Sequence, residues 1–343
     1  MRDRFERSIE YMRVSVTDRC NLRCIYCMPA EGVPCVRHSD ILTYDEIARI
    51  CRIASTIGIS RIKLTGGEPL VRRGLPDLLK MIKDIPGIEQ VTLTTNGILL
   101  KENIHELVSN GLDGVNISID TLDSRHYADI TRGGKLEEAL EGLEAALSYP
   151  DLTVRINSVP MAGMDQKEWI RLAGLARKEK LDVRFIEMMP IGLGKMFKGI
   201  SGDRIYEILK KEFGNAEECA EKYGNGPAVY VRFPGFKGKI GFIDAVSHQF
   251  CDRCNRVRLT SEGCLKPCLQ YGMGTDLRKL IRSGSDDAHI CHEMRRTIYE
   301  KPACHDFTRC ISGINPDRDK DNCPEGKENR QMFETKDMSQ IGG

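Results

Sequence analysis

The sequence has little of two features that would place a protein in a membrane or on a polyanion. No apolar run approaches the length of about 18 residues that spans a membrane, and the first segment, MRDRFERSIEYMRVSV, lacks the continuous apolar stretch of a secretory signal. Net charge is nearly absent as well, since 51 Lys and Arg residues balance 50 Asp and Glu residues to leave +1. We therefore expect a cytoplasmic protein that binds neither nucleic acid nor membrane, and any anion site must be a local pocket.

Cysteine, in contrast, is plentiful, with 14 in 343 residues. The chain is much too long, and its cysteines too sparse overall, for a small disulfide-stapled secreted scaffold. Clustered cysteines in an intracellular chain favour metal or redox chemistry instead. The length suggests about two domains at roughly 150 residues each.

The first half of the chain alternates short β-branched runs with segments of helical periodicity. Thr43 and Glu46 form a capping box before one such helix. We expect further helices over 75–85, 100–111, 124–149 and 166–179. Strands alternating with helices predict parallel βα units, and six of them indicate an α/β fold with a partial (β/α)6 TIM-like barrel. The expected strands are Met12–Thr17, Arg61–Thr65, Val91–Asn96, Gly114–Ile119, Thr153–Ser158 and Asp182–Glu187.

Five of these strands carry polar residues at every second position, whereas parallel strands covered on both faces are usually apolar throughout. Side chains two apart share one face of a strand. A solvated sheet face would explain the pattern, but helices between all the strands argue against one. We therefore expect a polar, cationic barrel interior. The residues concerned include Arg13, Lys63, Thr92, Thr94, Asn116, Ser118, Arg155 and Asn157.

The pattern changes after about residue 224, where Gly, Pro and aromatic residues become more frequent. We expect a barrel domain over 1–224 and a C-terminal domain over 225–343. The latter contains a helical stretch over 276–299 and a polar, Cys-containing segment over 301–330. That segment is expected to be a long, solvent-exposed loop with incidental thiols, although a third metal site is the alternative.

The first cysteine cluster, Cys20, Cys24 and Cys27, follows the first strand with the spacing C-x3-C-x2-C. One loop with this spacing can wrap a single cluster. Three ligands are one too few for a closed zinc site, but they suit a [4Fe–4S] cluster with one open iron. The alternatives are buried thiols or a zinc site completed by a distant residue.

This motif, with Tyr26 directly before the third Cys, resembles the signature of the radical S-adenosylmethionine (SAM) enzymes. The resemblance implies that the three cysteines hold a catalytic [4Fe–4S] cluster and that SAM binds its open iron. The segment Thr65–Pro69 (TGGEP) follows the second strand at the end where barrel active sites lie. The resemblance implies SAM contacts for Tyr26, Gly67, Ser118 and Met189.

The second cysteine cluster has the spacing C-x2-C-x13-C over Cys251, Cys254 and Cys268. Spacing alone also allows a zinc ribbon with Cys264 as a fourth ligand. Arg256 and Arg258 lie on one face of an extended segment, where two guanidinium groups form a fork for a polyphosphate. Two solvated arginines are the alternative.

At this point the sequence resembles one family, the GTP 3′,8-cyclases of molybdenum cofactor (molybdopterin) biosynthesis, over residues from about 8 to 300 and at the tail. The motifs are RVSVTDRCNLRCIYCMP, KLTGGEP, TLTTNG, NISID, RFIEMMP, GPA, IGFI and FCDRCNRVRLTSEGCLKPCL. The family forms 3′,8-cyclo-7,8-dihydro-GTP after a SAM-derived 5′-deoxyadenosyl radical removes H3′ of GTP and C3′ attacks C8. The resemblance implies a second [4Fe–4S] cluster on Cys251, Cys254 and Cys268. It implies GTP contacts for Arg13, Lys63, Thr94, Arg155, Arg256 and Arg258, with catalytic roles for the last two and for the first three cysteines.

The resemblance also implies partners and a role for the chain end. The expected partners are GTP, an electron donor, a second copy of the chain in a homodimer, and a cyclic pyranopterin monophosphate synthase that takes the product. The tail Gly342-Gly343 would reach into the active site, with a frayed end as the alternative. Arg155 stands where many members have Lys, and Arg184 and Glu187 are candidates for a final proton or electron donor.

Two other functions are compatible with parts of the pattern. A radical SAM peptide maturase would also carry auxiliary clusters, but it lacks a lumen rich in Lys and Arg. A non-enzymatic iron–sulfur or zinc protein would not need Tyr26 or the TGGEP segment.

Overall fold

Six parallel strands, arranged in chain order, form the centre of the fold. A computed structural model describes residues 1–34, 36–219, 224–307 and 333–342. The observed ends of the six strands agree with the predicted ends to within one residue, except that the first strand ends two residues earlier than predicted. The α/β fold with a partial (β/α)6 barrel is therefore confirmed. They are β1 (Tyr11–Ser15), β2 (Arg61–Thr65), β3 (Gln90–Thr95), β4 (Gly114–Ser118), β5 (Thr153–Ser158) and β6 (Asp182–Ile186).

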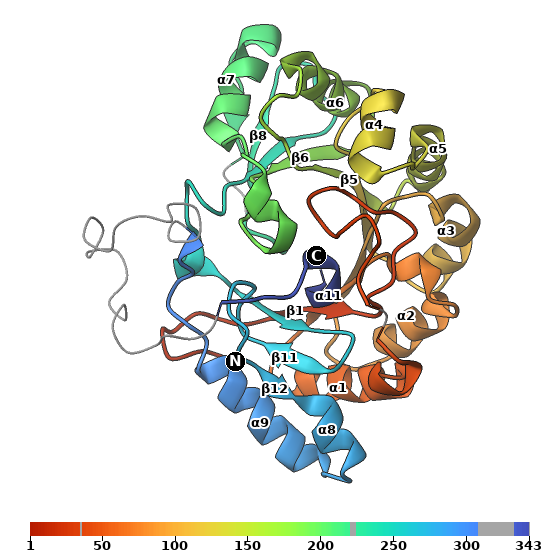
Figure 1. Cartoon of the computed structure of the whole chain (residues 1–343), viewed down its shortest axis with the longest axis vertical. Coiled ribbons are helices and arrows are strands. Elements are labelled where there is room, and N and C mark those ends of the chain that lie inside the picture. The colour runs from red at the N-terminus through yellow and green to blue at the C-terminus, as the bar shows by residue number, and fades with distance from the viewer. Residues whose placement is uncertain (35, 220–223, 308–332, 343) are drawn as a thin grey trace.

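Helices cover the outer side of the curved sheet, from α1 at the bottom of Figure 1 past α3 to α7 at the top. The predicted capping box is present, since the Thr43 side chain accepts from the Glu46 N–H and Glu46 accepts from the Thr43 N–H. The barrel helices are α1 (Tyr44–Thr56), α2 (Leu75–Lys83), α3 (Leu100–Ser109), α4 (Ser124–Thr131), α5 (Leu136–Leu147), α6 (Gln166–Lys178) and α7 (Gly202–Phe213). Single 3-10 turns lie at η1 (His38–Asp40), η2 (Pro69–Val71), η3 (Gly192–Met196) and η4 (Cys251–Arg253).

Two predicted helices are wrong because each is interrupted. The stretch 124–149 divides into α4 and α5, since Arg132 and Gly133 adopt positive φ angles of 56° and 106° that end a right-handed helix. The stretch 276–299 divides into α8 (Leu277–Arg282) and α9 (Asp287–Tyr299), with Gly284 at φ 85° between them. Asp286 then caps the new N-terminus by accepting from the His289 N–H.

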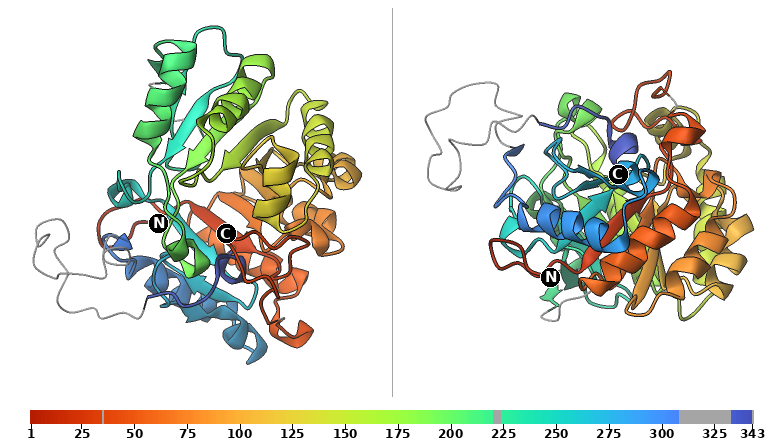
Figure 2. Two further views of the ribbon diagram at one scale, coloured as in Figure 1. Left: turned by 45° about the horizontal axis from the view of Figure 1, so that its top comes forward. Right: turned by 90° about the horizontal axis from the view of Figure 1, so that it is seen from below.

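Strands from the C-terminal third extend the barrel sheet at both edges. The order is β12-β11-β10-β1-β2-β3-β4-β5-β6-β9-β8-β7, with β9 parallel to β6 and β10 parallel to β1. The C-terminal region therefore extends the barrel wall, and α9 lies beside α1 in Figure 2. The added strands are β7 (Glu217–Glu218), β8 (Val229–Arg232), β9 (Ile240–Ile243), β10 (Arg256–Leu259), β11 (Cys264–Lys266) and β12 (Thr275–Asp276), followed near the chain end by the helix α11 (Met338–Ile341).

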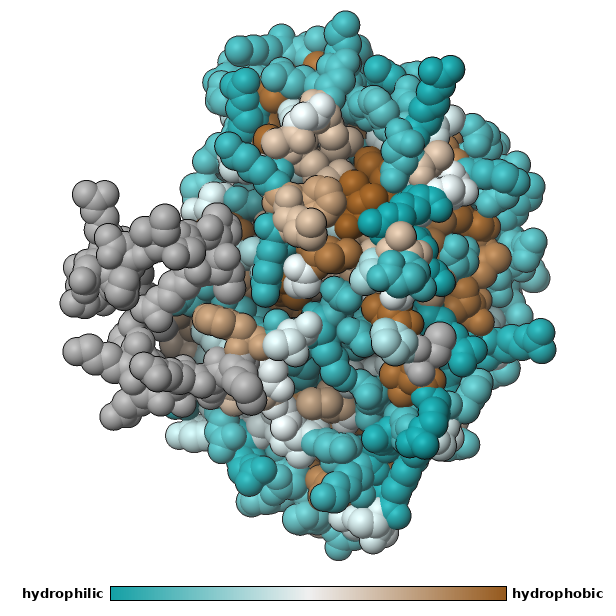
Figure 3. Space-filling view, viewed as in Figure 1, coloured by the Kyte–Doolittle hydropathy of each residue, from teal (hydrophilic) through white to brown (hydrophobic). Residues whose placement is uncertain are grey.

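The apolar core lies between the sheet and the helices. Alternate strand residues such as Val14, Leu64 and Ile117 are fully buried against helix residues such as Ile50 and Leu79. This leaves the other face of each strand for the barrel interior. Hydrophilic residues cover most of the outer edge in the space-filling view (Figure 3). Within the described residues no helix is long and apolar enough to cross a membrane.

Candidate functional site

Cationic side chains from opposite ends of the chain meet on the inner face of the sheet. Arg13 on β1 is in register with Lys63 on β2 and with Arg258 on β10, so three basic residues stand side by side on adjacent parallel strands. On the other side of the barrel, Asn157 on β5 is in register with Arg184 on β6. Because register partners point to the same face, the pairing predicts one shared basic surface.

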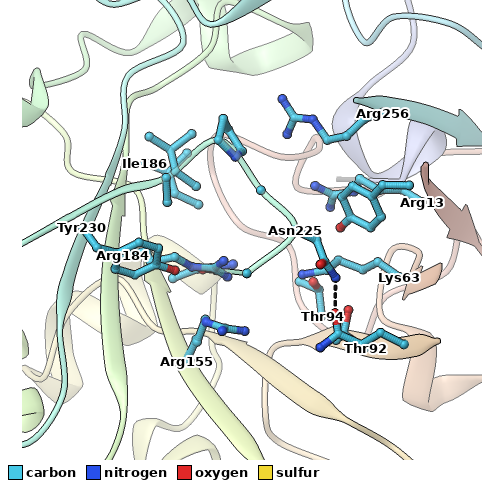
Figure 4. Close-up of a pocket in the computed structure, with 18 residues that line it drawn as sticks. Arg13, Lys63, Thr92, Thr94, Arg155, Arg184, Ile186, Asn225, Tyr230 and Arg256 are labelled. Atoms are coloured by element: carbon cyan, nitrogen blue, oxygen red, sulfur yellow. Dashed lines mark hydrogen bonds between the residues drawn. The ribbon is translucent and has the colours of Figure 1, made fainter. Parts of the chain in front are cut away.

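All of these side chains except Arg258 line a cavity of about 650 Å³, counting the space open to solvent at its mouth. In Figure 4 Arg155 and Arg184 face Arg13 and Lys63 across the cavity, with Arg256 at one end. The predicted polar interior is therefore present. Its lining comprises Tyr11, Arg13, Lys63, Gln90, Thr92, Thr94, Arg155, Asn157, Arg184, Ile186, Tyr230, Ile243, Arg256 and residues 224–228.

Among the residues that the structure describes, the charge in this cavity is only partly balanced. Arg155 has an ion pair with Asp182, whose Oδ2 lies 3.4 Å from its Nε, and Arg184 donates to the side-chain oxygens of Asn116 and Asn157. Burial, together with repulsion from Arg184, Arg13, Arg155 and Arg256, holds the pKa of Lys63 well below its usual value. An anion with several negative charges would relieve this repulsion.

Two hydroxyls in the wall point to a polar ligand. The Oγ1 atoms of Thr92 and Thr94 are buried, and neither has a hydrogen-bond partner among the residues that the structure describes. Buried hydroxyls are normally paired, so a ligand in the cavity is the natural partner.

Residues 224–228 close one side of the cavity, where the Asn225 amide donates to the Gln90 side chain (Figure 4). Sequence reasoning missed Tyr11, Gln90, Asn225 and Tyr230, because none carries a motif and their strands or turns meet only in the fold.

The first cysteine loop is anchored to the C-terminal end of α4. The N–H groups of Arg23 and Ile25 donate to the carbonyls of Thr131 and Ile130, and the Cys27 N–H donates to the Cys24 carbonyl at 2.9 Å. Cys20, Cys24 and Cys27 are free, partly buried thiols. Burial raises the pKa of Cys20 to about 11 and that of Cys27 to about 12. The Leu22 N–H and Arg23 partly offset the effect at Cys20, whereas Cys20 and Asp337 add to it at Cys27. Bound iron would stabilise the thiolates, so this donor set fits an iron–sulfur cluster.

The TGGEP segment packs directly on the first cysteine loop. A Cβ on Gly67 would lie 2.4 Å from the Arg19 carbonyl oxygen, so no larger residue fits there. Contact between the two loops therefore requires glycine at this position. Buried Glu68 accepts hydrogen bonds from the N–H groups of Leu70 and Asn96 and from the Thr95 hydroxyl, which ties this segment to the end of β3.

Two of the predicted SAM contacts lie near the carboxyl end of β4. The Tyr26 hydroxyl donates to Asp120 Oδ2 at 2.7 Å, and Asp120 Oδ1 accepts from the Val159 N–H. Ser118 is the last residue of β4. Met189 lies elsewhere, in the wall of a second cavity, where it packs against Ile191 and its neighbours.

This second cavity holds the second cysteine cluster. Cys251, Cys254 and Cys268 line it, together with Arg7, Arg256, Arg258, Lys301 and His305. Burial raises the pKa of the Cys254 thiol, but the positive charges of Lys301 and Arg256 outweigh that effect and lower the pKa to about 6. A thiol that ionises readily is a good iron ligand.

Cys264 is not among the residues that line this cavity. It pairs with Asp276 across β11 and β12, and its charged neighbours are Lys266, Asp276, Lys336 and Glu262. Among the described residues, no three His, Cys, Asp or Glu side chains are placed to hold one metal ion, as a zinc ribbon would require. Cysteine ligands of a [4Fe–4S] cluster bind different irons and need not converge on one point.

Arg256 and Arg258 separate in the structure. Arg256 stacks on the Phe250 ring and lines both cavities, whereas Arg258 lines only the second and its Nη1 donates to the Gly342 carbonyl at 2.6 Å. The two arginines therefore do not form the expected fork on one anion, because Arg256 lines the cationic cavity whereas Arg258 binds the tail. The Glu187 carboxylate is hydrogen-bonded to a turn, since its Oε2 accepts from the N–H groups of Val246 and Ser247.

The tail enters the barrel as expected. A Cβ on Gly342 would lie 3.0 Å from Ser15 Cβ and from Thr65 Oγ1, and the Ser339 backbone hydrogen-bonds the Cys27 thiol. In Figure 1 α11 accordingly lies in the middle of the molecule, over β1. Gly343 and residues 308–332 lie outside the described residues, so expectations for Cys310, Cys323 and the C-terminal part of the 301–330 loop are not tested.

The start of that predicted loop is not exposed, which corrects the expectation. Lys301, His305 and Phe307 are buried. Phe307 packs with Ile191, Ala245 and Ile341, and Arg7 donates to the carbonyls of Pro302 and Ala303. Residues 301–307 therefore form a wall of the second cavity.

Two family models match the chain. The model of the radical SAM superfamily covers residues 14–187, and the model described as Molybdenum Cofactor Synthesis C covers residues 181–307. Among curated relatives, a GTP 3′,8-cyclase of Clostridium perfringens (strain SM101 / Type A) is 46% identical over 307 residues, covering 90% of this chain and 95% of that protein. A GTP 3′,8-cyclase of Petrotoga mobilis is 40% identical, and the match covers the whole of both chains.

Solved structures support the fold. Streptococcus suis SuiB bound to S-adenosylmethionine matches with a TM-score of 0.58 at 13% identity, over 89% of this chain and 66% of that one. SuiB bound to its precursor peptide SuiA matches with a TM-score of 0.60 at 15% identity, over 89% and 67%. At these identities the likeness concerns the fold alone.

Proposed function

The chain belongs to the GTP 3′,8-cyclase family of radical SAM enzymes, and we propose that it converts GTP to (8S)-3′,8-cyclo-7,8-dihydroguanosine 5′-triphosphate, the first step of molybdenum cofactor biosynthesis. The observation that carries the proposal is the cationic cavity, whose wall includes Arg256, two positions after Cys254 of the second cysteine cluster. A GTP bound there would have its triphosphate on the basic residues and its base toward Cys251, Cys254 and Cys268.

The reaction is an isomerisation of the nucleotide. The C3′–H bond of the ribose is broken, a C3′–C8 bond forms, and N7 gains a hydrogen. The hydrogen atom lost from C3′ leaves in 5′-deoxyadenosine, and N7 gains a different hydrogen as one electron and one proton, so no net oxidant is needed. An external one-electron donor of low potential supplies one electron for the cleavage of SAM and one for the reduction of the cyclised nucleotide.

The basic residues bind and orient the substrate. Arg13 and Lys63 stand side by side and face Arg155 and Arg184 across the cavity, so a triphosphate between them contacts both walls (Figure 4). Guanidinium groups form paired hydrogen bonds with phosphate oxygens, which orients the nucleotide as well as binding it. The free hydroxyls of Thr92 and Thr94 are further donors to the ligand.

The cysteines would hold two [4Fe–4S] clusters, with SAM on the first. When bound, SAM and the first cluster supply the 5′-deoxyadenosyl radical that removes H3′. Tyr26, Gly67, Ser118 and Met189 are proposed SAM contacts, and the Tyr26–Asp120 hydrogen bond supports the first of them by fixing the ring at the end of β4. We propose that the tail, which contacts Arg258, and residues 301–307, which line the second cavity, limit the access of water to a reactive radical.

Arg184 is the remaining candidate for delivering the final proton within the cavity. It is buried, and two Asn side chains fix its guanidinium. Glu187 is a poorer candidate because it holds the turn at 246–247.

Further partners follow from the family. We propose a homodimer, a low-potential electron donor, and transfer of the product to a cyclic pyranopterin monophosphate synthase. Because iron–sulfur clusters and free thiols need a reducing compartment, we propose that the protein works in the cytoplasm.

Anaerobic reconstitution tests the proposal. We expect about eight irons per chain, from two four-iron clusters, and formation of 5′-deoxyadenosine that depends on GTP when SAM and dithionite are present. About four irons, or turnover of a peptide without a response to GTP, would instead favour a peptide maturase.

A further inference from the structure

Lys301 is a buried lysine at the second cysteine cluster that neither the motifs nor the family roles account for. It follows α9 and is 3% exposed. Its Nζ donates to the Arg256 carbonyl at 2.9 Å and to the Pro267 carbonyl at 2.5 Å. Arg256 follows Cys254 by two positions, and Pro267 directly precedes Cys268. The ammonium group therefore joins the two chain segments that supply the cluster's cysteines.

Lys301 also faces the thiols themselves. It lines the same cavity as Cys251, Cys254 and Cys268. The segment it begins adds a second contact, since the His305 N–H donates to Cys251 Sγ at 3.4 Å. Hydrogen bonds and charges at the sulfurs are among the factors that set the reduction potential of an iron–sulfur cluster.

No carboxylate balances this buried charge among the residues that the structure describes. Two other buried cations of the region are paired: Lys266 with Glu334, and Arg7 with Asp3 at 2.6 Å. Two carbonyl dipoles alone are poor compensation for a buried ammonium. The anions at hand are the thiolates that a cluster would bring.

We propose that Lys301 is the counter-cation of the second cluster, a positioning residue whose charge offsets the thiolates and raises the reduction potential of that cluster. The inference rests on the proposed function to the extent that Cys251, Cys254 and Cys268 hold a [4Fe–4S] cluster. Reduction adds one electron to the cluster, and a fixed positive charge in a low-dielectric cavity favours the more negative state. Loss of the charge must then make the cluster harder to reduce.

Three substitutions separate charge from hydrogen bonding. Lys301→Gln removes the charge but keeps a donor, Lys301→Arg keeps the charge, and Lys279→Gln removes one charge from an exposed site in the same region. Each is made in the full chain carrying Cys20→Ala, Cys24→Ala and Cys27→Ala, so that only the second cluster gives a signal. The reduction potential is measured anaerobically by electron paramagnetic resonance during a redox titration, without SAM or GTP.

In Lys301→Gln we expect at least a tenfold fall in the ratio of reduced to oxidised cluster at a fixed applied potential, equivalent to about 59 mV for one electron. Lys301→Arg and Lys279→Gln should remain close to the parent. Loss of the cluster in Lys301→Gln with retention in Lys301→Arg would also support a charge role.

An unchanged potential in Lys301→Gln would overturn the inference, as would equal loss of the cluster from the Gln and Arg variants, because either result means that Lys301 only ties two loops together. Failure of the proposed function looks different. In that case the parent with intact Lys301 takes up no second cluster at all.

Discussion

Arg13 and Arg258 are in-register partners on the neighbouring parallel strands β1 and β10, although they come from opposite ends of the chain. Their charges repel, and burial together with Arg13 and Arg256 holds the pKa of Arg258 well below its usual value. A fold that places like charges on adjacent strands sacrifices stability for binding, and the pairing of β10 with β1 creates this arrangement.

Replacing both Arg256 and Arg258 with Ala should weaken GTP binding and leave the clusters in place. A hydrogen bond to a charged group contributes about 1.5–3 kcal/mol, so the Kd for GTP should rise at least about tenfold. Calorimetry under anaerobic conditions measures the Kd, and iron analysis measures the clusters.

Arg253→Ala is the matched control, because that side chain is 77% exposed beside the same cysteines. If the double variant loses iron, the two arginines support the cluster structurally and our interpretation of them is wrong.

Lys63→Met should stabilise the ligand-free protein while weakening GTP binding. The substitution removes a buried cation that four arginines repel, and Met fills a similar volume. We expect a higher Tm without ligand and at least about a tenfold increase in the Kd for GTP. Lys167→Met, at an exposed site on α6, is the control. A lower Tm for Lys63→Met would show that the repulsion is not a significant destabilising factor.

The same residue predicts a pH dependence. Because the pKa of Lys63 is lowered in the folded state, the unfolded chain binds more protons than the folded one at pH values between the folded pKa and 10.5. Stability of the ligand-free protein should therefore rise with pH across that window. Denaturant titrations at several pH values test this, and the slope attributable to Lys63 should vanish in Lys63→Met.

Several of these relationships could not be predicted from the sequence. Alternation along the strands indicated the polar interior, because a period of two is set within each strand. The pairing of β10 with β1 depends on contacts between segments that are distant in the chain. The sequence therefore did not predict that Arg258 lies beside Arg13. The prediction of an exposed loop is wrong for residues 301–307, because Lys301 and Phe307 are buried although the segment is polar in composition.

The interrupted helices have a local cause that composition did not reveal. Arg132 adopts the left-handed conformation although Gly is the usual residue for it, and Gly134 then approaches the Leu22 side chain. The break lets the carbonyls of Ile130 and Thr131 accept from the first cysteine loop. A feature that appears as an irregular helix thus positions the proposed site.

Gly67→Ala should disrupt the first cluster and spare the second. Its Cβ would overlap the backbone of Arg19, and backbone cannot move aside as a flexible side chain can. We expect a loss of about 1–3 kcal/mol in the free energy of unfolding and about four irons in place of about eight. Gly174→Ala on α6 is the control, since nothing lies within 4 Å of its added Cβ. Full iron content in Gly67→Ala would contradict the close contact between the two loops.

Gly342→Val should impair GTP turnover without loss of iron. Gly342 has a φ of 77°, and its added Cβ would meet Ser15 and Thr65 at 3.0 Å, so the variant must displace the tail from Arg258. We expect unchanged iron content and at least about a tenfold lower rate of product formation, because Arg258 loses its partner in a buried site. Wild-type turnover would mean that the tail position has no part in the reaction.

The central claim is that GTP in the cationic cavity loses H3′ to a radical derived from SAM. The most direct measurement uses GTP carrying deuterium at C3′, with mass spectrometry of the 5′-deoxyadenosine formed by the reconstituted enzyme. Our account predicts one deuterium in the 5′-deoxyadenosine, with the nucleotide product lacking it. Unlabelled 5′-deoxyadenosine formed in the presence of GTP, with deuterium retained in the nucleotide, would contradict it.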